Sequence, residues 1–310
     1  VKKILNKKKI AVVTGGAGFI GSHMVDLLLE KKYRVHVIDN LSSGHKKNLA
    51  HHYNNPLLKF KKINICKLKP NNKLFKNANY IFHFAGIGDV VPSIKKPDNY
   101  MMTNIHGTIK VLEAARYAKV KKFIYAASAS CYGKSTKRTK ENSKINLENP
   151  YAFSKYLGEK AVFHWSKVYG LPVNSIRIFN AYGTRIKTTG AYSAVIGIFF
   201  KQRIKKQPLT IVGDGKQTRD FIYVTDVAKA FLAAAKTPIA GTIYNVGSGN
   251  SQSVNFLANL IGGKKVFTPN RLGESKHSCA NIEKIKRQLK WKPKVLFKDG
   301  IAKIFNEITK

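Results

Sequence analysis

Strand-like and helix-like spacings of apolar residues alternate along the first 180 residues. A β-branched, apolar run at Ile10–Thr14 predicts a buried strand, and apolar residues at helical spacing predict a helix over Phe19–Glu30. The same alternation continues to residue 179. It predicts a doubly wound α/β fold with a mostly parallel sheet, because crossover helices cover both faces of such a sheet. Further strands are expected at Arg34–Asp39, 58–63, 80–85, 122–127 and 173–179, and further helices from Pro97 to about residue 118 and after Pro150.

Turn-forming residues become frequent after about residue 180, and the expected helices become shorter. These helices are expected at 191–205, Val224–Lys236, 253–261 and 282–289. No low-complexity linker separates the two parts, so they are expected to share strands, helices and one core. The pattern predicts a first domain over residues 1–180 and a smaller C-terminal α/β lobe over residues 181–310.

A glycine-rich loop joins the first expected strand to the first expected helix. Residues 14–21 read Thr-Gly-Gly-Ala-Gly-Phe-Ile-Gly, in which Gly16, Gly18 and Gly21 fit G-x-G-x-x-G. Without side chains, the backbone N–H groups at the helix N-terminus can approach a pyrophosphate closely. Between a strand and a helix, the loop predicts a Rossmann-type domain that binds a dinucleotide, although a tight turn without a ligand is the alternative.

The second expected strand ends at Asp39, 18 residues after Gly21. A carboxylate at this place can accept hydrogen bonds from both ribose hydroxyls of an adenosine, and it repels a 2′-phosphate. No Arg lies nearby in the sequence, although Lys46 and Lys47 follow. The expected cofactor is therefore NAD rather than NADP.

Tyr151 and Lys155 are spaced to lie one turn apart on the helix that Asn149 and Pro150 are expected to start. A Lys ammonium beside a phenol favours the phenolate and lowers the phenol pKa. Tyr151 is therefore the expected proton acceptor near neutral pH. An ordinary helix with a surface Tyr and a solvated Lys would carry the same spacing.

Ser128 directly follows the expected strand at 122–127. Ligands of open parallel sheets bind at the carboxyl ends of the strands, so a hydroxyl here can donate a hydrogen bond to a substrate oxygen. Ser130 competes for this role, and either residue could instead only cap a turn.

The chain contains 56 Lys and Arg but only 16 Asp and Glu, a net charge of +40. RNA binding is one explanation. However, Lys far outnumbers Arg and is spread along the whole chain, whereas nucleic-acid sites concentrate Arg and aromatic residues. A compositional bias is the favoured explanation, with no nucleic-acid partner, and the positive field would also attract phosphorylated substrates.

The cysteine content argues for a reducing compartment, and the hydropathy argues against a membrane-spanning segment. Cys66, Cys131 and Cys279 are too few and too far apart for a disulfide framework or a metal-ligand pattern. No apolar run approaches the roughly 20 residues that span a bilayer. A cytoplasmic protein without a metal or a membrane partner is expected.

Together these motifs resemble the extended short-chain dehydrogenases/reductases, specifically the nucleotide-sugar 4-epimerase group, and the resemblance runs nearly end to end. Besides the glycine loop, the segments that carry it are 39–44, 83–86, Asn104 with 107–108, Ser128 with 132–133, Tyr151 with Lys155, 177–183, 213–215, 218–221 and 245–249.

The resemblance implies roles for single residues. It assigns catalysis to Ser128, Tyr151 and Lys155, and it makes the C-terminal lobe the substrate-binding part. The implied cofactor contacts are Gly15, Gly18, Phe19, Ile20, Gly21, Asp39, Asn40, Ser42, Gly44, Phe84, Ala85, Gly86, Asn104, Tyr151 and Lys155. The implied substrate contacts are Ser130, Asn180, Arg219, Arg271 and Ser278.

Arg219 and Arg271 would clamp a diphosphate, because a guanidinium gives phosphate two parallel hydrogen bonds. The alternative for Arg219 is an ion pair with its neighbour Asp220. The alternative for Arg271 is that it is simply a charged residue in a loop. The resemblance places Ser278 at the family position where a bulky Tyr narrows the sugar pocket, which implies room for an N-acetyl group. The segment 190–196 resembles the family variant for N-acetylated sugars.

Positions 129 and 130 separate the chemistries within this family. Related dehydratases carry an Asp-Glu pair there and related decarboxylases keep a Glu, whereas this chain has Ala129 and Ser130. The resemblance therefore implies epimerisation of UDP-glucose and UDP-galactose, and of their N-acetyl forms, through a transient 4-keto sugar. It also implies a homodimer through a four-helix bundle. The segment 88–92 departs from the family, because it lacks the Lys that some sugar epimerases carry there, which leaves cofactor contacts at this point open.

Two other functions remain open at this stage. One is a reductase, dehydratase or different epimerase of the same superfamily. The other, of a different class, is a non-enzymatic Rossmann protein that binds RNA.

Overall fold

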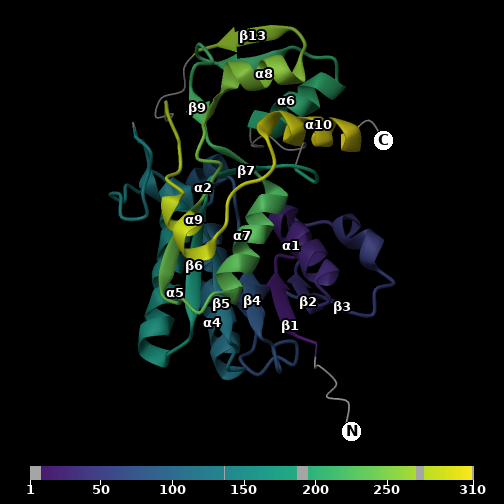
Figure 1. The fold of residues 1–310 in the computed structure, drawn as a ribbon, viewed down its shortest axis with the longest axis vertical. Coiled ribbons are helices and arrows are strands. Elements are labelled where there is room, and N and C mark those ends of the chain that lie inside the picture. Colours follow the sequence, from purple (N-terminus) through teal and green to yellow (C-terminus); the bar gives the residue numbers. More distant parts are fainter. Residues whose placement is uncertain (1–7, 136, 187–194, 270–275, 309–310) are drawn as a thin grey trace.

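The computed structural model describes residues 8–135, 137–186, 195–269 and 276–308. Through this part of the chain runs a parallel sheet of seven strands, in the order β11-β6-β5-β4-β1-β2-β3 (Figure 1). It confirms the predicted doubly wound, Rossmann-type sheet. The strands are β1 (Ile10–Thr14), β2 (Arg34–Asp39), β3 (Leu58–Lys62), β4 (Tyr80–His83), β5 (Lys122–Ser128), β6 (Val173–Ile178) and β11 (Thr242–Val246).

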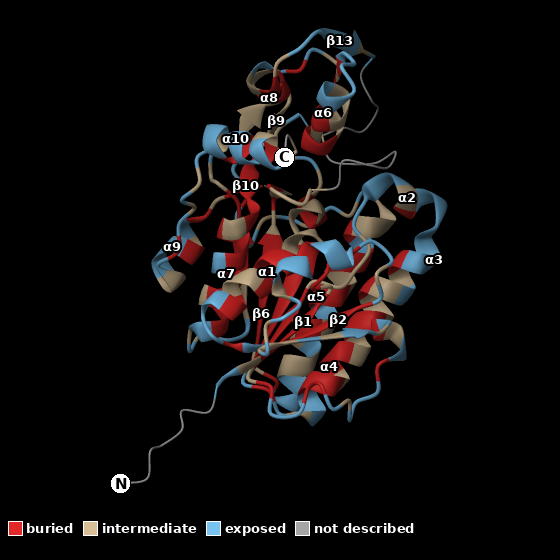
Figure 2. Cartoon of the chain, turned by 90° about the vertical axis from the view of Figure 1, so that its right-hand side faces the viewer, coloured by how far each residue is buried: buried red, intermediate tan, exposed pale blue. Residues whose placement is uncertain are grey.

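Both faces of the sheet are covered, so the central strand β1 is apolar on both sides. In β1, Ala11 and Val13 pack into one core with α1 (Phe19–Glu30) and α7 (Val224–Lys236). Val12, between them, packs into the opposite core with α4 (Gly107–Tyr117) and α5 (Pro150–Tyr169). Figure 2 shows the buried strands enclosed between these layers.

The helix expected from Pro97 to about residue 118 forms, but its interior is not regular. It consists of α3 (Pro97–Tyr100), a π-helical segment η3 (Met101–His106) and α4. A π-turn widens the helix by one residue, and such turns are frequent at functional sites. Here the widened turn contains Asn104, which apolar periodicity alone could not indicate.

The C-terminal part contributes β11, α7 and α9 (Glu283–Leu289) to the central fold, while the rest of it forms a smaller unit above the sheet (Figure 1). This unit has its own core, in which the aromatic rings of Tyr182, Phe200 and Phe221 are buried. Its helix α10 and its strand pair β8–β13 were not anticipated from the sequence. Its elements are β7 (Asn180–Tyr182), α6 (Val195–Ile204), β8 (Leu209–Val212), β9 (Thr218–Arg219), β10 (Phe221–Tyr223), β12 (Gln252–Ser253), α8 (Val254–Ile261), β13 (Lys265–Thr268) and α10 (Phe297–Ile308).

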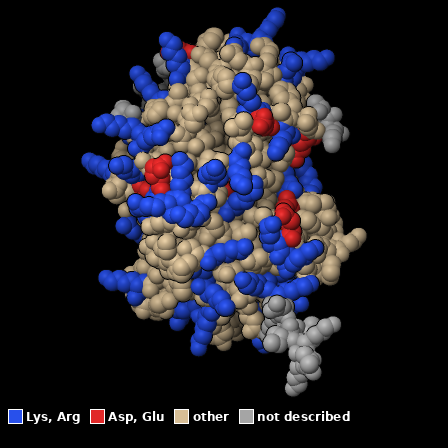
Figure 3. Space-filling model, viewed as in Figure 1, with Lys and Arg blue, Asp and Glu red and all other residues tan. Residues whose placement is uncertain are grey.

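The described helices and the surface charge agree with the composition. None of the helices in the described ranges has both the length and the apolar character that a bilayer crossing requires. Lys and Arg side chains are scattered over the face shown in Figure 3 rather than gathered on one element.

Candidate active site

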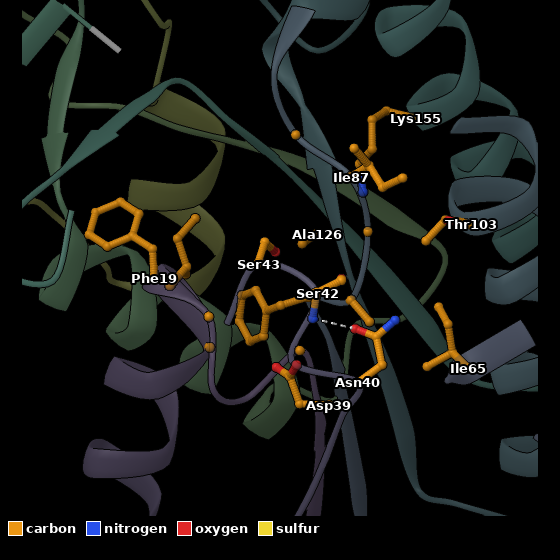
Figure 4. A pocket seen from close by; sticks show the side chains of 18 of the residues that line it. Phe19, Asp39, Asn40, Ser42, Ser43, Ile65, Ile87, Thr103, Ala126 and Lys155 are labelled. Atoms are coloured by element: carbon orange, nitrogen blue, oxygen red, sulfur yellow. Dashed lines mark hydrogen bonds between the residues drawn. The ribbon is translucent and has the colours of Figure 1, made fainter. Parts of the chain in front are cut away.

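A cavity of about 660 Å³ opens at the carboxyl ends of the central strands (Figure 4). Phe19 lies at one end and Lys155 at the other, with Asp39 and Asn40 on the side of β2. This elongated shape suits a dinucleotide. The predicted cofactor residues that line it are Gly15, Gly18, Phe19, Ile20, Gly21, Asp39, Asn40, Ser42, Phe84, Ala85, Gly86, Tyr151 and Lys155.

Glycine is required in the loop because the backbone approaches itself too closely for a side chain. Gly15 has a φ of +71°, and a Cβ on it would lie 2.6 Å from the backbone N of Ala85. A Cβ on Gly21 would lie 2.1 Å from the carbonyl O of Gly15. Gly18 precedes α1 as its N-cap without a side-chain hydrogen bond. Gly18 and the first turn of α1 line the cavity, so an anion there can bind the free N–H groups of the helix N-terminus.

Asp39 holds the glycine loop as well as facing the cavity. Its Oδ2 accepts a hydrogen bond from the N–H of Ala17 (3.0 Å), and its Oδ1 accepts one from the N–H of Leu41 (2.7 Å). An ionised carboxylate accepts about four hydrogen bonds, so acceptor sites remain for ribose hydroxyls. Gly44 packs directly against this carboxylate, since a Cβ there would lie 2.9 Å from Oδ2.

Replacing Asp39 by Asn should weaken NAD binding about 10- to 100-fold, because one oxygen acceptor and its charge are lost. Calorimetric titration of cofactor-free protein with NAD measures the effect. Asp214→Asn, in a turn outside this cavity, is the matched control. An unchanged Kd in Asp39→Asn would show that the carboxylate does not contact the cofactor.

Ser128, Tyr151 and Lys155 meet at the far end of the cavity, where β5 ends and α5 begins. Asn149 caps α5 by accepting a hydrogen bond from the N–H of Ala152 (2.9 Å), and Pro150 follows it as predicted. Ser130 donates from its Oγ to Ser128 Oγ (2.8 Å). The Ser128 proton is therefore free to point at Tyr151, to which Ser128 is hydrogen-bonded.

The expected effect of Lys155 on Tyr151 is wrong for the cofactor-free protein. Burial raises the pKa of Tyr151 above its usual value, and the Ser128 hydrogen bond opposes this only in part. Burial also lowers the pKa of Lys155 to about 8, with Glu159 acting against the shift. The Lys155 Nζ lies 4.5 Å from the centroid of the Tyr125 ring. Desolvation of the phenol therefore affects the Tyr151 pKa more than its pairing with Lys155 does. The spacing of the two residues in the sequence cannot reveal this desolvation.

Asn104 supports the cavity instead of lining it. Its Oδ1 accepts from the N–H of Ile87 (2.8 Å), and its Nδ2 donates to the carbonyl of Ile87 (3.1 Å) and to Ser154 Oγ (2.9 Å). It thereby fixes the loop after β4 to the helix that carries Tyr151. Asn104 therefore lies behind the residues that line the cavity and is not one of them.

His83 is also fully buried behind the residues that line the cavity. Its Nδ1 is 2.6 Å from Thr14 Oγ1 and its Nε2 is 2.9 Å from Thr108 Oγ1. Burial lowers the pKa of His83 to about 3, and the nearby Lys155 charge adds to the shift. The imidazole is therefore neutral throughout the physiological pH range.

Acid should destabilise the fold through His83. Below about pH 6.5 the unfolded chain protonates this side chain while the folded chain does not, so the free energy of unfolding falls by about 3 kcal/mol between about pH 6.5 and about pH 4. Denaturant titrations of the protein and of His83→Asn across this range measure it. His23, whose pKa burial lowers to about 4, contributes equally to both proteins. Parallel pH dependences of the two proteins would contradict the assignment.

The predicted substrate residues that the structure describes do not line this cavity. Asn180 donates from Nδ2 to the carbonyl of Asp220 (3.3 Å), and Arg219 donates from Nη1 to the carbonyl of Thr218 (3.0 Å). Ser278 is half-buried. Ser130 contacts Ser128, as described above. Arg271 and residues 190–194 lie outside the described part of the chain.

Sequence reasoning missed several residues of the cavity wall. The segment after β3 lines it, and so does the widened helical turn before α4. The rule that ligands bind at strand ends could have indicated the first group, but the second depends on the π-turn. The residues missed are Ile38, Ser43, Ile63, Asn64, Ile65, Cys66, Ile87, Gly88, Asn99, Met102, Thr103, Ala126, Ala127, Ile178, Phe179 and Ala181.

Comparison with known proteins adds independent support. The model of the NAD dependent epimerase/dehydratase family matches residues 11–247. The chain is 34% identical over 301 residues to the UDP-glucose 4-epimerase of Mycolicibacterium smegmatis, covering 94% of this chain and 96% of that protein. It is 31% identical over 315 residues to UDP-glucuronic acid decarboxylase 1 of Arabidopsis thaliana, covering 97% of this chain and 70% of that protein.

A solved structure is similar over nearly the whole chain. It is the UDP-N-acetylglucosamine 4-epimerase from Methanobrevibacter ruminantium M1 in complex with UDP-N-acetylmuramic acid, with a TM-score of 0.93 and 32% sequence identity. The match covers 98% of this chain and 99% of that one. These comparisons confirm the predicted fold class, the family resemblance and NAD as the cofactor.

Proposed function

Because the chain belongs to the NAD-dependent epimerase/dehydratase family, we propose that it is a UDP-sugar 4-epimerase. The observation that carries the proposal is the cavity end formed by Ser128, Tyr151 and Lys155. A proton acceptor, a hydroxyl donor and a cation meet there without a carboxylate at positions 129 or 130. This set can move a proton to and from a sugar hydroxyl. It lacks the acid–base pair for eliminating water.

Bound NAD would accept the hydride from C4 of the sugar and return it to the opposite face. Tyr151 takes the proton of the 4-hydroxyl in the first half of the reaction and gives it back in the second. Ser128 donates a hydrogen bond to the sugar 4-oxygen in both halves of the reaction. Its proton is available for this because Ser130 donates its own hydrogen bond to the Ser128 oxygen.

Tyr151 requires help to ionise, because its pKa is raised in the cofactor-free protein. Lys155, one turn away, is the nearest cation on the same helix. Its ammonium and the positive ring of the oxidised cofactor would together favour the phenolate. We therefore expect Tyr151 to act as a base only when NAD is bound.

Two observations support the sugar class that we propose. Ser278 is small and half-buried, which leaves space for a 2-acetamido group. The similarity to a UDP-N-acetylglucosamine 4-epimerase supports this class. We therefore propose UDP-N-acetylglucosamine as a substrate alongside UDP-glucose. Asn180, Arg219 and Arg271 are the proposed contacts to the nucleotide sugar.

Incubation with UDP-glucose, UDP-galactose and their N-acetyl forms tests the proposal. The expected product is the 4-epimer of the sugar supplied, formed without net consumption of NAD. A 4-keto-6-deoxy sugar would indicate a dehydratase, and a pentose from UDP-glucuronate would indicate a decarboxylase. Stoichiometric consumption of NADH would indicate a reductase. Each of these results would replace the epimerase assignment.

We also propose that two copies of the chain pair through α4 and α5, which lie together on one face of the sheet. These helices carry exposed apolar side chains at Tyr117 (64%), Val168 (53%) and Tyr169 (48%). Tyr169→Asp should convert a dimer to a monomer in light scattering. Phe267→Asp, on the distant β13, should leave the mass unchanged. A monomer in the unmodified protein would refute the pairing.

A further inference from the structure

Three side chains that take no part in the cavity converge beside α1. Asp26 lies on α1, and His51 and His52 end the short helix η1 (Lys46–His52). The Nε2 atoms of both imidazoles lie 2.9 Å from the same atom, Oδ1 of Asp26. The ligand atoms that these residues offer all lie within 4.8 Å of one another. Two adjacent histidines thus aim the same ring nitrogen at one carboxylate oxygen.

We propose that Asp26, His51 and His52 form a binding site for a divalent transition-metal ion, with Zn²⁺ as the best match. Zn²⁺ binds imidazole nitrogen and carboxylate oxygen at about 2.0–2.2 Å, which places the ligands of a tetrahedral site about 3.3 Å apart. The present separations of 2.9 Å need to widen by only a few tenths of an ångström. Mg²⁺ and Ca²⁺ prefer oxygen ligands and do not suit this set.

Arg185 orients the carboxylate for this role. Its Nη2 lies 2.8 Å from Asp26 Oδ2, which leaves Oδ1 for the ion. Ligating carboxylates are commonly hydrogen-bonded in this way through outer groups. One carboxylate oxygen of Asp26 is thus held by Arg185, and the other is directed at both imidazoles.

The same guanidinium sets a condition on the ion. Arg185 Nη2 lies 3.4 Å from His51 Nε2, so its charge repels any cation that binds there. Attraction by charge alone cannot fill the site. The ion must instead gain its affinity from bonds to imidazole, which again selects a transition metal.

The site can be reached from solvent, and it joins three segments. The His51 side chain is 48% exposed. Arg185 follows β7, and its backbone N–H donates to Glu307 Oε2 on α10 (2.8 Å). A bound ion would therefore link α1, η1 and the entry to the C-terminal unit. Because it binds only the folded chain, it should stabilise the fold.

Titration of the metal-free full-length protein with ZnCl₂ tests the proposal, whatever the outcome of the epimerase assay. Calorimetry should show one ion bound per chain, and the melting temperature should rise. The double variant His51→Asn/His52→Asn should lose both effects. His164→Asn, an exposed histidine on α5, is the matched control and should keep them.

Three results would overturn the metal site. One is the absence of saturable Zn²⁺ binding, which would show that the Arg185 charge prevails. Another is equal binding by the double variant. The third is equal binding of MgCl₂, which would show that charge rather than imidazole holds the ion. Cobalt substitution gives a second readout, because Co²⁺ held by two imidazoles and a carboxylate should absorb in the visible range in the unmodified protein alone.

Discussion

Replacing Tyr151 by Phe should lower kcat about 10²- to 10⁴-fold, the usual contribution of a positioned proton-transfer group. In the proposed mechanism, the phenol oxygen takes the proton of the 4-hydroxyl, and Phe has no equivalent atom. The ring itself should remain in place, edge-on to Tyr100 with 6.4 Å between the centroids. Steady-state assays of epimer formation measure the loss. The melting temperature should stay close to that of the unmodified protein.

Tyr156→Phe provides the matched control for this prediction. Tyr156 lies on the same helix, half-buried and away from the cavity lining, with Lys160 Nζ 5.1 Å from the centre of its ring. Removing its hydroxyl should leave kcat within about twofold, because surface changes away from the site have small effects. Full activity in Tyr151→Phe would transfer the role of base to another group.

Replacing Gly15 by Ala should both destabilise the fold and empty the cofactor site. The φ of +71° costs a non-glycine residue about 1–3 kcal/mol. The added Cβ would also lie 2.6 Å from the backbone N of Ala85, which forces the glycine loop away from β4. The free energy of unfolding should fall by at least that amount, and the purified variant should carry less NAD.

Gly88→Ala is the control for Gly15→Ala, because it adds a methyl group at the same cavity without backbone strain or a close contact. Gly88 also lies at the cavity, but a Cβ there meets no atom within 4 Å and its backbone is unstrained. Denaturant unfolding should therefore show little change. If Gly15→Ala unfolded at the same denaturant concentration as Gly88→Ala, the close approach of the loop to β4 would be refuted.

The sequence predicts the central fold well because its strands and helices have distinct apolar periods. Ile10–Thr14 is buried on both faces, and Phe19–Glu30 buries one stripe, so each pattern fits one kind of element. The C-terminal unit is harder to predict. Its strands β9 and β12 are two residues long, and its core depends on aromatic residues from distant segments. Such pairings follow from tertiary packing, not from local spacing.

The cofactor end of the site is predictable for a related reason. Loops at the ends of neighbouring parallel strands must meet, and the glycine loop and Asp39 are both local motifs at such ends. The sign of the pKa shift at Tyr151 was not predictable. It depends on how deeply α5 buries the phenol, which spacing to Lys155 does not show. Asn104 was likewise assigned to the cofactor, although its hydrogen-bonding groups are used within the protein wall.

Conversion of UDP-N-acetylglucosamine in D₂O tests the central claim most directly. If Ser128, Tyr151 and Lys155 support transient oxidation at C4, the hydrogen at C4 is held by the cofactor and returned. The NMR spectrum should then show the 4-epimer with hydrogen, not deuterium, at both C4 and C5. Deuterium at either carbon, or a product altered at C5 or C6, would contradict the proposed 4-epimerase.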